Sequence, residues 1–406
     1  MPLRGGIMLV VRHSLALLAL SSALATTAIA DASPIGFASL NGGTVGGGNG
    51  PTVTATTASQ FRNYAKQPGP LNILVDRSLN IGGTSIASDK TILGVGDAGE
   101  LVGSLQLSGV NNVIIQNLAI SNPSNAGEGD SITLRASTNV WIDHNNIFNA
   151  PDGLLDIVRE SDFVTVSWNK FFYTQEYADS ANSGHRFAML IGNTDNAPED
   201  ADNLRVTMHH NYWGDLVHER MPRVRYGDVH VFNNYFNTPG DNYAIRIAKA
   251  SELLIENNSF EDVTDPYEKY ITEGPDGLAE ARGNLFVRTS GKRDAGDDVF
   301  DPPYEYAMDA AVDVKALVLA SAGIGHLPSY LAGDFNQDGV VDGADLLAWQ
   351  RGESSIPYSA VDLTEWQSQL GATNSQASTS PVPEPCGMAL ALAAIFAISS
   401  SGLRPE

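Results

Sequence analysis

The sequence has little cysteine and little positive charge. Cys386 is the single cysteine in 406 residues, so no disulfide can form within the chain. Only 24 Lys and Arg residues stand against 47 Asp and Glu, which gives a formal net charge of −23. A field of this sign repels nucleic acid and anionic membrane surfaces, so the folded domain is expected to bind neither. The fold must depend on packing, backbone hydrogen bonds and any bound cations.

Long apolar runs are confined to the two ends of the chain. Basic residues precede the run "SLALLALSSALA", and "AIA" at 28–30 offers small residues for cleavage. This pattern predicts a signal peptide over residues 1–30 and a secreted or cell-surface protein. After a polar linker at 373–381, residues 382–406 combine "VPEP", an apolar run and Arg404. They resemble a PEP-CTERM sorting signal, which implies transient membrane anchoring through the tail; a plain apolar tail is the alternative.

The middle of the sequence repeats. Between residues 110 and 290 an apolar residue is followed three positions later by asparagine, and successive asparagines lie 28, 24, 42, 23, 24 and 26 residues apart. Such a period is typical of a solenoid, and the alternating, β-branched stretches favour strands over helices. The step of 42 marks an insertion. The asparagines are Asn117, Asn145, Asn169, Asn211, Asn234, Asn258 and Asn284.

The period predicts an all-β domain over residues 31–327, a parallel β-helix with three short strands in each coil. Each asparagine is expected to adopt a left-handed turn conformation and to hydrogen-bond the next asparagine in the stack. Ordinary turns of an antiparallel sandwich are the alternative. A helix at 55–67, starting at Thr57 or Ser59, is expected to cap the first coil, and the Ala-rich segment 304–323 to cover the last.

Two pairs of acids flank the second asparagine unit. Glu128 and Asp130 lie two positions apart, so on an extended strand their side chains project the same way. Asp152 and Asp156 follow about one coil later, which places them beside the first pair. Four carboxylates in one place repel one another, and a hard divalent cation such as Ca²⁺ relieves the repulsion. Solvated loop acids of an acidic protein are the alternative.

The stretch "HERMPRVRYG" concentrates the scarce positive charge, with Arg220, Arg223 and Arg225 within six positions. Guanidinium groups beside a cation site are compatible with it if an anion lies between them, because arginine binds carboxylates in a bidentate manner. We therefore expect these arginines to face an acidic ligand. The alternative is that they pair with surface acids, namely Glu219, Asp215 and Asp228.

Several of these stretches, in this order, resemble the pectate lyases of polysaccharide lyase family 1. The resemblance covers about residues 34–326 and rests on "GFASLNGGTVGGGNG", "NVWIDHN", "DGLLDI", "VTVSWNKF", "MLIGNTD" and "HHNYWGDLVHERMPRVR". It implies a right-handed parallel β-helix and a Ca²⁺-dependent β-elimination of polygalacturonate. Carried onto this sequence, it implies a catalytic Ca²⁺ site made of Glu128, Asp130, Asp152 and Asp156.

The same resemblance assigns roles to the arginines. The Arg-x-Pro-x-x-Arg pattern implies that Arg220 is the catalytic base and that Arg225 holds a substrate carboxylate, with Arg223 as a further substrate contact. Where the family commonly has a substrate-binding lysine this sequence has Phe187, and we expect the adjoining Arg186 to take its place. Other polar residues of the coils are expected to be packed and not catalytic, namely Asp143, His144, His209 and His210.

A second calcium motif follows this domain. "GDFNQDGVVDGADLLAWQRG" at 333–352 has oxygen ligands at the positions of an EF-hand loop, a glycine for the sharp turn, and a helix after it. It resembles a dockerin repeat and predicts a small α-helical, EF-hand-like module at 332–372. Because a second ligand loop is missing, a Ca²⁺-stabilised spacer is favoured over a module that binds cohesin. The predicted ligands are Asp334, Asn336, Asp338, Asp342 and Asp345, with the carbonyl of Val340.

Together these observations predict a secreted, monomeric, Ca²⁺-dependent pectate lyase. Two alternatives stay open. The first is a pectin lyase that acts on methylated chains without metal, which the retention of four carboxylates disfavours. The second is a catalytically silent, pectin-binding surface protein, which the phenylalanine at position 187 keeps open.

Overall fold

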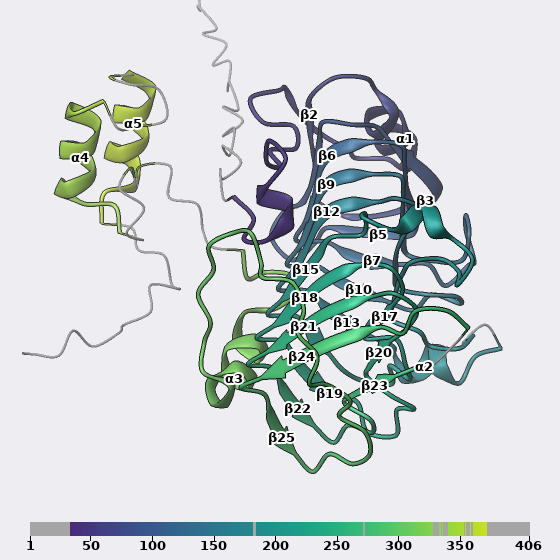
Figure 1. Cartoon of the computed structure of the whole chain (residues 1–406). Coiled ribbons are helices and arrows are strands. Elements are labelled where there is room, and N and C mark those ends of the chain that lie inside the picture. Colours follow the sequence, from purple (N-terminus) through teal and green to yellow (C-terminus); the bar gives the residue numbers. More distant parts are fainter. Residues whose placement is uncertain are drawn as a thin grey trace, which may run out of the picture.

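The computed structural model describes residues 33–181, 184–270 and 273–327, and further along the chain residues 333, 335, 340–352, 354, 358 and 360–371. Strands stack one above another, from the end covered by α1 (Ala58–Lys66) to β25 (Leu285–Val287) (Figure 1). The strand pairs formed by these residues are parallel throughout. The predicted parallel β-helix is therefore confirmed. The predicted signal peptide, linker and sorting tail lie outside the described residues.

From β6 (Asn111–Gln116) to β23 (Tyr267–Lys269), each coil contributes one strand to each of three faces. The first face is a sheet of ten strands. Its buried aliphatic residues repeat in register, so that Val140 and Ile142 stack on Val164 and Val166 of the next coil. The strands of the first face are β1 (Thr52–Thr54), β2 (Leu71–Val75), β4 (Lys90–Gly94), β6 (Asn111–Gln116), β9 (Thr138–Asp143), β12 (Asp162–Ser167), β15 (Val206–His209), β18 (Asp228–Phe232), β21 (Glu252–Glu256) and β24 (Leu278–Arg282).

The second and third faces are joined by one long strand, β5 (Glu100–Ser108), which pairs with a strand of each. Beside it, the second face contains β3 (Ser78–Ile86), β8 (Ile132–Arg135), β11 (Leu155–Val158), β14 (Met189–Ile191), β17 (Arg223–Val224), β20 (Ile245–Ile247) and β23 (Tyr267–Lys269). The third face contains β7 (Ala119–Ser121), β10 (Asn146–Phe148), β13 (Lys170–Phe172), β16 (Tyr212–Trp213), β19 (Tyr235–Asn237), β22 (Ser259–Glu261) and β25.

Aromatic rings fill the interior behind the third face. Phe171 stacks on Trp213 with 4.3 Å between ring centroids, and Phe236 stacks on Phe260 at 4.5 Å. Phe286 continues the row 5.5 Å from Phe260. Aromatic side chains bury more apolar area than any other residue type, so this row is a major part of the packing that replaces disulfides here.

The helix α1 caps the first coil, as the sequence predicts. Its N-cap is Thr57, whose hydroxyl accepts a hydrogen bond from the backbone N–H of Gln60 at 3.2 Å. Phe61 and Ala65 on its inner side are fully buried in the core. The remaining helical segments are η1 (Phe37–Ser39), α2 (Gln175–Ala178), η2 (Pro198–Asp200), α3 (Ala311–Ser321), α4 (Gly343–Gln350) and α5 (Ala360–Gln369).

An asparagine ladder runs along the turn between the first and third faces. Each side-chain amide donates to the Oδ1 of the next asparagine at 2.9–3.1 Å. The same Oδ1 accepts the backbone N–H of the preceding member, so buried turn amides are satisfied. The insertion within the 42-residue step does not interrupt the ladder. Its members are Asn145, Asn169, Asn211, Asn234, Asn258 and Asn284.

Two details of the predicted repeat are wrong. The register pairs Gln116 with Asp143, so Leu118 and not Asn117 occupies the ladder position, where only its backbone N–H can join by donating to Asn145. The left-handed conformation belongs to the residue before each ladder asparagine, for example His144 with a φ of 52°. The preceding residue makes the turn, which leaves the asparagine side chain free to bond inside the stack.

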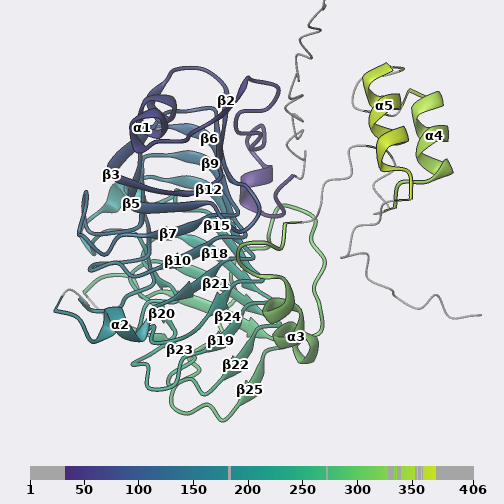
Figure 2. The same cartoon turned by 180° about the vertical axis from the view of Figure 1, so that it is seen from behind.

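The prediction for residues 304–323 is also wrong, because this segment lies along the side of the solenoid. The hydroxyl of Tyr304 lies 2.7 Å from Thr207 Oγ1 and 2.8 Å from His230 Nδ1, on the outside of the first face. The helix α3 then packs its buried Val314 and Val318 beside β19 and β22 (Figure 2). The segment covers polar groups of β15 and β18, and α3 packs against the rings of Trp168, Tyr212 and Tyr235. Within the described residues no helix is long and apolar enough to cross a membrane.

Candidate active site

The residues predicted to form the site lie on or beside the second face. There the register aligns Thr133, Asp156, Leu190 and Arg223 in one row across β8, β11, β14 and β17. Residues of one row point to the same side of the sheet, and successive strands are about 4.8 Å apart. A line drawn across the strands therefore leads from the predicted acids to the predicted arginines.

Asp130, Asp152 and Asp156 come together at the β11 end of this line. Asp130 and Asp152 lie in the turns that precede β8 and β11, and Asp156 lies within β11. The Oδ1 atoms of Asp130 and Asp156 both lie 3.0 Å from the position that a Cβ would take on Gly153, so they face the same small space. The three residues are called the acid trio below.

The acid trio is a crowded cluster of like charges. Burial, and then the charges of Asp156 and Asp152, raise the pKa of Asp130 to about 8. Burial and the charge of Asp152 raise the pKa of Asp156 to about 7, although Arg220 opposes the shift. Each unit of pKa corresponds to about 1.4 kcal/mol, so ionisation of these two carboxyls is strongly disfavoured. The site favours a proton or a bound cation at neutral pH.

The donor set of the acid trio suits a hard divalent cation. Oδ1 of Asp130 is buried and has no hydrogen-bond partner in the described part of the chain, whereas its Oδ2 accepts from Thr133 Oγ1 at 3.0 Å. Ca²⁺ accepts such carboxylate oxygens in flexible geometry. Among the described residues, no three acidic or histidine side chains already surround one metal position. A cation would have to draw the carboxylates inward from where they stand.

Glu128, the fourth predicted ligand, stands apart from the acid trio. Its carboxylate forms an ion pair with Nη2 of Arg135, and its side chain is 42% exposed. It is flanked by Gly127 and Gly129, which adopt φ values of 60° and 102°. Such values are accessible to glycine without strain, and they turn Glu128 outward toward the end of β8. The predicted quartet is therefore a trio with an ion-paired glutamate beside it.

Arg220 lies within electrostatic range of the acid trio. Its charge lowers the pKa of Asp156, in opposition to burial. The centre of its guanidinium lies 3.6 Å from the centroid of the Phe187 ring, a cation–π contact. Its Nε is buried and has no hydrogen-bond partner among the described residues. The ring of Phe187 therefore positions the guanidinium of Arg220, and the Nε of Arg220 can still donate a hydrogen bond.

Arg223 and Arg225 have different environments. Arg223 lies in the outward row, and burial, followed by the charge of Arg225, lowers its pKa. Its Nε is buried without a partner in the described part of the chain. Arg225 is buried and donates to Asp195 Oδ1 and to the carbonyl of Gly192. Its ionic partner is Asp195, which sequence reasoning did not name.

Arg186 lies near the site, and its side chain is half-buried. It acts electrostatically on Tyr173, whose hydroxyl also feels Asp130 and Asp152. Burial raises the pKa of Tyr173 well above its usual range, so it stays protonated and donates to the carbonyl of Phe187 at 2.8 Å. Tyr173 therefore fixes the backbone that carries both Arg186 and the ring under Arg220.

Sequence reasoning missed the roles of Gly153, Thr133, Arg135 and Tyr173. Thr133 and Asp156 become neighbours through the register of β8 and β11. The two residues lie one coil apart, so the period of the repeat carried a signal for this pairing that sequence reasoning did not use. A partial signal exists for Gly153, which directly follows the predicted ligand Asp152.

The histidines lie on the first face, in the packed positions that the sequence analysis expects. Trp168 stacks between His144 and His210, with ring centroids 5.8 and 4.2 Å away. His144 bonds Asp143 at 2.7 Å, and burial lowers the pKa of His209 well below its usual value. These groups belong to the packing of the first face.

The C-terminal calcium loop is described only in part. Asp342 and Asp345 form the N-terminal cap of α4: Asp342 accepts from the N–H of Ala344, and Asp345 Oδ2 accepts from the N–H of Asp342 at 2.8 Å. Trp366 of α5 donates to the carbonyl of Asp342 at 2.7 Å. Val340 is described as well, whereas Asp334, Asn336 and Asp338 lie outside the described residues. The helices of the predicted module are present, and its ligand sphere stays a prediction.

The chain matches the pectate lyase family model over residues 5–277. A pectate trisaccharide-lyase of Bacillus licheniformis is 34% identical over 319 residues, which cover 74% of this chain and 88% of the relative. Pectate lyase plyB of Emericella nidulans is 36% identical over 242 residues, which cover 57% of this chain and 70% of the relative.

Solved structures give the same result. Pectate lyase Bsp165PelA from Bacillus sp. N165, in complex with trigalacturonate, has a TM-score of 0.63 at 31% identity, covering 72% of this chain and 99% of that one. The cedar pollen allergen Jun a 1 has a TM-score of 0.58 at 27% identity, covering 72% and 92%. With the row of acids and arginines on a parallel β-solenoid, these likenesses define an enzyme of the polysaccharide lyase class. The chain belongs to the pectate lyase family.

Proposed function

We propose that this enzyme is a Ca²⁺-dependent pectate lyase that cleaves α-1,4-polygalacturonate by β-elimination, with Arg220 as the base. The observation that carries the proposal is the place of Arg220 beside the acid trio. Its carbonyl accepts from the N–H of Met189, which is paired with Leu155 next to Asp156, and its charge lowers the pKa of Asp156 against the effect of burial. The relatives support the substrate class: one is named a pectate trisaccharide-lyase, and Bsp165PelA was solved with trigalacturonate.

The chain's own residues account for binding and proton transfer. Arg223 offers a carboxylate of the substrate a guanidinium whose Nε has no hydrogen-bond partner among the residues that the structure describes. Arg225, paired with Asp195, orders the loop around the site and contacts substrate less directly than the resemblance implies. Arg186 stays a proposed further contact, close to the ring that supports Arg220.

The elimination needs a base at C5 of the uronate. Arg220 in its neutral form takes the C5 proton, and the electron pair of the C5–H bond becomes the C4–C5 double bond. The C4–O bond breaks, and the glycosidic oxygen leaves with the other fragment and gains a proton. Ca²⁺ bound by the acid trio, with Glu128 as a proposed further ligand, would withdraw charge from the carboxylate next to C5.

The substitution Arg220→Lys tests this proposal. We expect turnover of polygalacturonate, followed by the ultraviolet absorbance of the unsaturated product, to fall by about a hundredfold or more. Arg288→Lys is the matched control, because Arg288 is exposed and pairs with Glu261 and Asp262 on the last coil. Both variants should keep the melting temperature of the parent. An Arg220→Lys enzyme with parental turnover would refute the base assignment, and a parent enzyme inactive on every pectic substrate would refute the proposed function.

The choice between pectate and methylated pectin has its own test. A methyl ester removes the negative charge that would bridge the acid trio's cation and the arginines, so the free acid is the favoured substrate. We expect higher activity on polygalacturonate than on highly methylated pectin, and loss of activity with a chelator. Faster turnover of methylated pectin, indifferent to chelator, would favour a pectin lyase.

Export through residues 1–30 and anchoring through residues 382–406 are further proposals that rest on the sequence. Secretion and cleavage at the predicted "AIA" site can be checked by N-terminal sequencing of the exported protein.

A further inference from the structure

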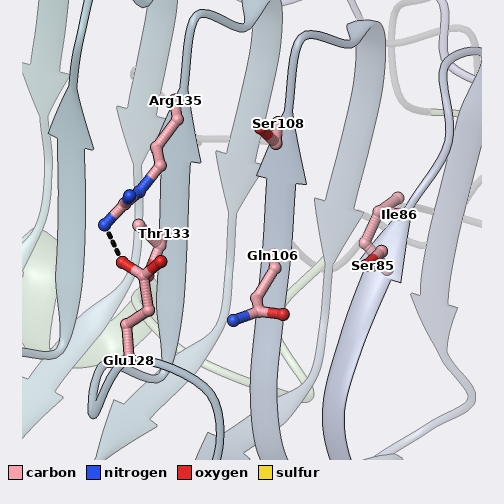
Figure 3. Close-up of a pocket in the computed structure, with 7 residues that line it drawn as sticks. All are labelled: Ser85, Ile86, Gln106, Ser108, Glu128, Thr133 and Arg135. Atoms are coloured by element: carbon pink, nitrogen blue, oxygen red, sulfur yellow. Dashed lines mark ion pairs between the residues drawn. The ribbon is translucent and has the colours of Figure 1, made fainter.

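A cavity of about 300 Å³ opens on the second face beside the acid trio. Figure 3 shows Gln106 between the Glu128–Arg135 ion pair on one side and Ser85 with Ile86 on the other. Apart from Ile86, the lining side chains are polar. They are Ser85, Gln106, Ser108, Glu128, Thr133 and Arg135. Hydroxyl, amide and guanidinium groups around a shallow cavity suit a sugar better than an apolar ligand.

The cavity continues the row of the active site. The strand register pairs Ser85 with Gln106, Gln106 with Thr133, and Thr133 with Asp156. Gln106 therefore lies two strands from Asp156, which corresponds to roughly 10 Å at the usual spacing of strands. A chain of sugars that crosses the strands over the acid trio would enter this cavity next, on the side away from Arg220.

The lining groups have hydrogen-bonding capacity to offer. In the part of the chain that the structure describes, the side chains of Ser85, Gln106 and Ser108 have no hydrogen-bond partner. Arg135 uses Nη2 to pair with Glu128, but its Nε is buried without a partner. Because a guanidinium carries five N–H donors, Arg135 can keep Glu128 and still bind a second acceptor.

The charge around the cavity favours an anion. Burial lowers the pKa of Arg135, and the next largest cause is the charge of Arg159, which therefore lies nearby. The geometry agrees, since the carbonyl of Arg159 accepts from the N–H of Ala136 next to Arg135. The charge of Asp156 acts on Arg135 in the opposite direction and offsets the two guanidinium groups in part. An acidic ligand can pair with Arg135 directly, through the donors that Glu128 leaves free.

We propose that this cavity is a further subsite, which binds the next uronate unit of the polymer held at the acid trio. Arg135 binds the carboxylate of that unit, and Gln106 with the two serines binds its hydroxyl groups. The inference rests on the proposed function, because it names the substrate of the same groove. It adds a specificity determinant that the reaction at Arg220 does not itself require.

The test measures kcat/KM on oligogalacturonates of increasing length, for the parent enzyme, Arg135→Met and Gln106→Leu. In the parent, kcat/KM should rise with each added unit until the cavity is filled. In Arg135→Met, the last increment, about tenfold to a hundredfold, should be lost from the ratio of kcat/KM for long and short oligomers, a ratio that cancels any change at the acid trio. Gln106→Leu, which leaves the ion pair intact, should lose a smaller part of the same increment. Arg77→Met, which removes an exposed arginine paired with Asp76, is the control and should change nothing.

Two further arms keep the outcomes distinct. Oligomers that carry a methyl ester on the unit bound in the cavity should show little difference between the parent and Arg135→Met, since no carboxylate is left to bind. Calorimetric binding of the same free-acid oligomers reports on the cavity even without turnover. An inactive parent that still loses affinity in Arg135→Met would refute the lyase mechanism and keep the subsite. Equal length dependence in the parent and both cavity variants would overturn the subsite.

Discussion

The first and second faces of this solenoid both bury ionisable groups, and they treat charge in opposite ways. On the first face burial alone would raise the pKa of Glu256, but hydrogen bonds from His230, Tyr306 and Arg282 outweigh it and lower the pKa to about 2. On the second face the neighbours of Asp130 are other carboxylates, and its pKa rises to about 8.

Both carboxylates are buried, so the difference in their pKa values comes from their neighbours: hydrogen-bond donors on the first face and other carboxylates on the second. A buried carboxylate with donors on both oxygens stabilises the folded chain in its ionised form, whereas one crowded by like charges needs a proton or a cation. The first face therefore supplies stability without ligand. On the second face the crowded carboxylates are stabilised only when a proton or a cation binds, and a site for a metal and an acidic polymer has this property.

The largest expected effect is on activity, from the second face. Asp156→Asn should lower turnover of polygalacturonate by about a hundredfold or more, because the charge stabilisation that a metal supplies is worth several kcal/mol. Without added cation the same change should raise the free energy of unfolding, since it removes one of three crowded charges. Product absorbance and denaturant unfolding in chelator measure the two effects. A variant that loses stability as well as activity would show that Asp156 is paired and not crowded.

The next effect is on stability, from the first face. Glu256→Gln should lower the free energy of unfolding by about 3 kcal/mol, because it leaves His230 and Arg282 without their buried anionic partner. Turnover per folded molecule should stay at the parental value, since Glu256 lies outside the groove. Denaturant unfolding followed by an assay of the folded fraction checks both statements. Unchanged stability would contradict the role given to this pair.

The two faces should also respond to pH with opposite sign. Folded Asp130 and Asp156 keep their protons up to pH values near their pKa values of about 8 and about 7, above the ordinary value of 3.8. The folded state then binds more protons than the unfolded state, so the stability contributed by these protons is lost as pH rises through 7 and 8. Glu256 contributes stability above its ordinary pKa that is lost as pH falls toward 2.

Melting curves in chelator should therefore show a decline in the free energy of unfolding between pH 5 and pH 8, of at least about 2 kcal/mol. Added Ca²⁺ should offset the decline at pH 8 and do little at pH 5, where protons occupy the carboxyls. A stability that rises steadily to pH 8 in chelator would mean that the trio is not crowded in solution.

The smallest effect is expected where charges are paired but exposed. Arg288→Met on the last coil removes ion pairs to Glu261 and Asp262, and the arginine side chain is 60% exposed. Exposed pairs contribute about 0–1 kcal/mol, so the melting temperature should barely change. A loss comparable to that of Glu256→Gln would mean that burial matters less to these pairs than the two faces suggest.

Much of the fold could be predicted from one repeated residue. The ladder asparagines keep a near-constant period because each must meet the next along the stack, and that period fixes the solenoid and its parallel strands. The phase at Asn117 was wrong because a leucine occupies the first ladder position, where only the backbone N–H bonds to Asn145. The spacing of asparagines alone cannot show that Asn117 lies one position before the ladder.

The site was predictable to the extent that it follows strand order. Asp130, Asp152 and Asp156 meet because their spacing is close to one coil, and Arg220 joins them from a later one. The pairing of Glu128 with Arg135 depends on the direction of one glycine-flanked turn, which no spacing encodes. The contact of Phe187 with Arg220 likewise depends on a local pairing, the bridge between Phe187 and Glu219, which no spacing encodes.

The register of the second face makes it a ruler as well as a scaffold. In the row from Gln106 through Asp156 to Arg223, backbone hydrogen bonds set the distance between neighbouring residues at about 4.8 Å per strand. Side-chain packing does not set it. Loops between the strands can therefore lengthen, as in the 42-residue step, without changing the distances between the residues of this row. An enzyme built this way can vary what surrounds its polymer while the intervals that it measures along the chain stay the same.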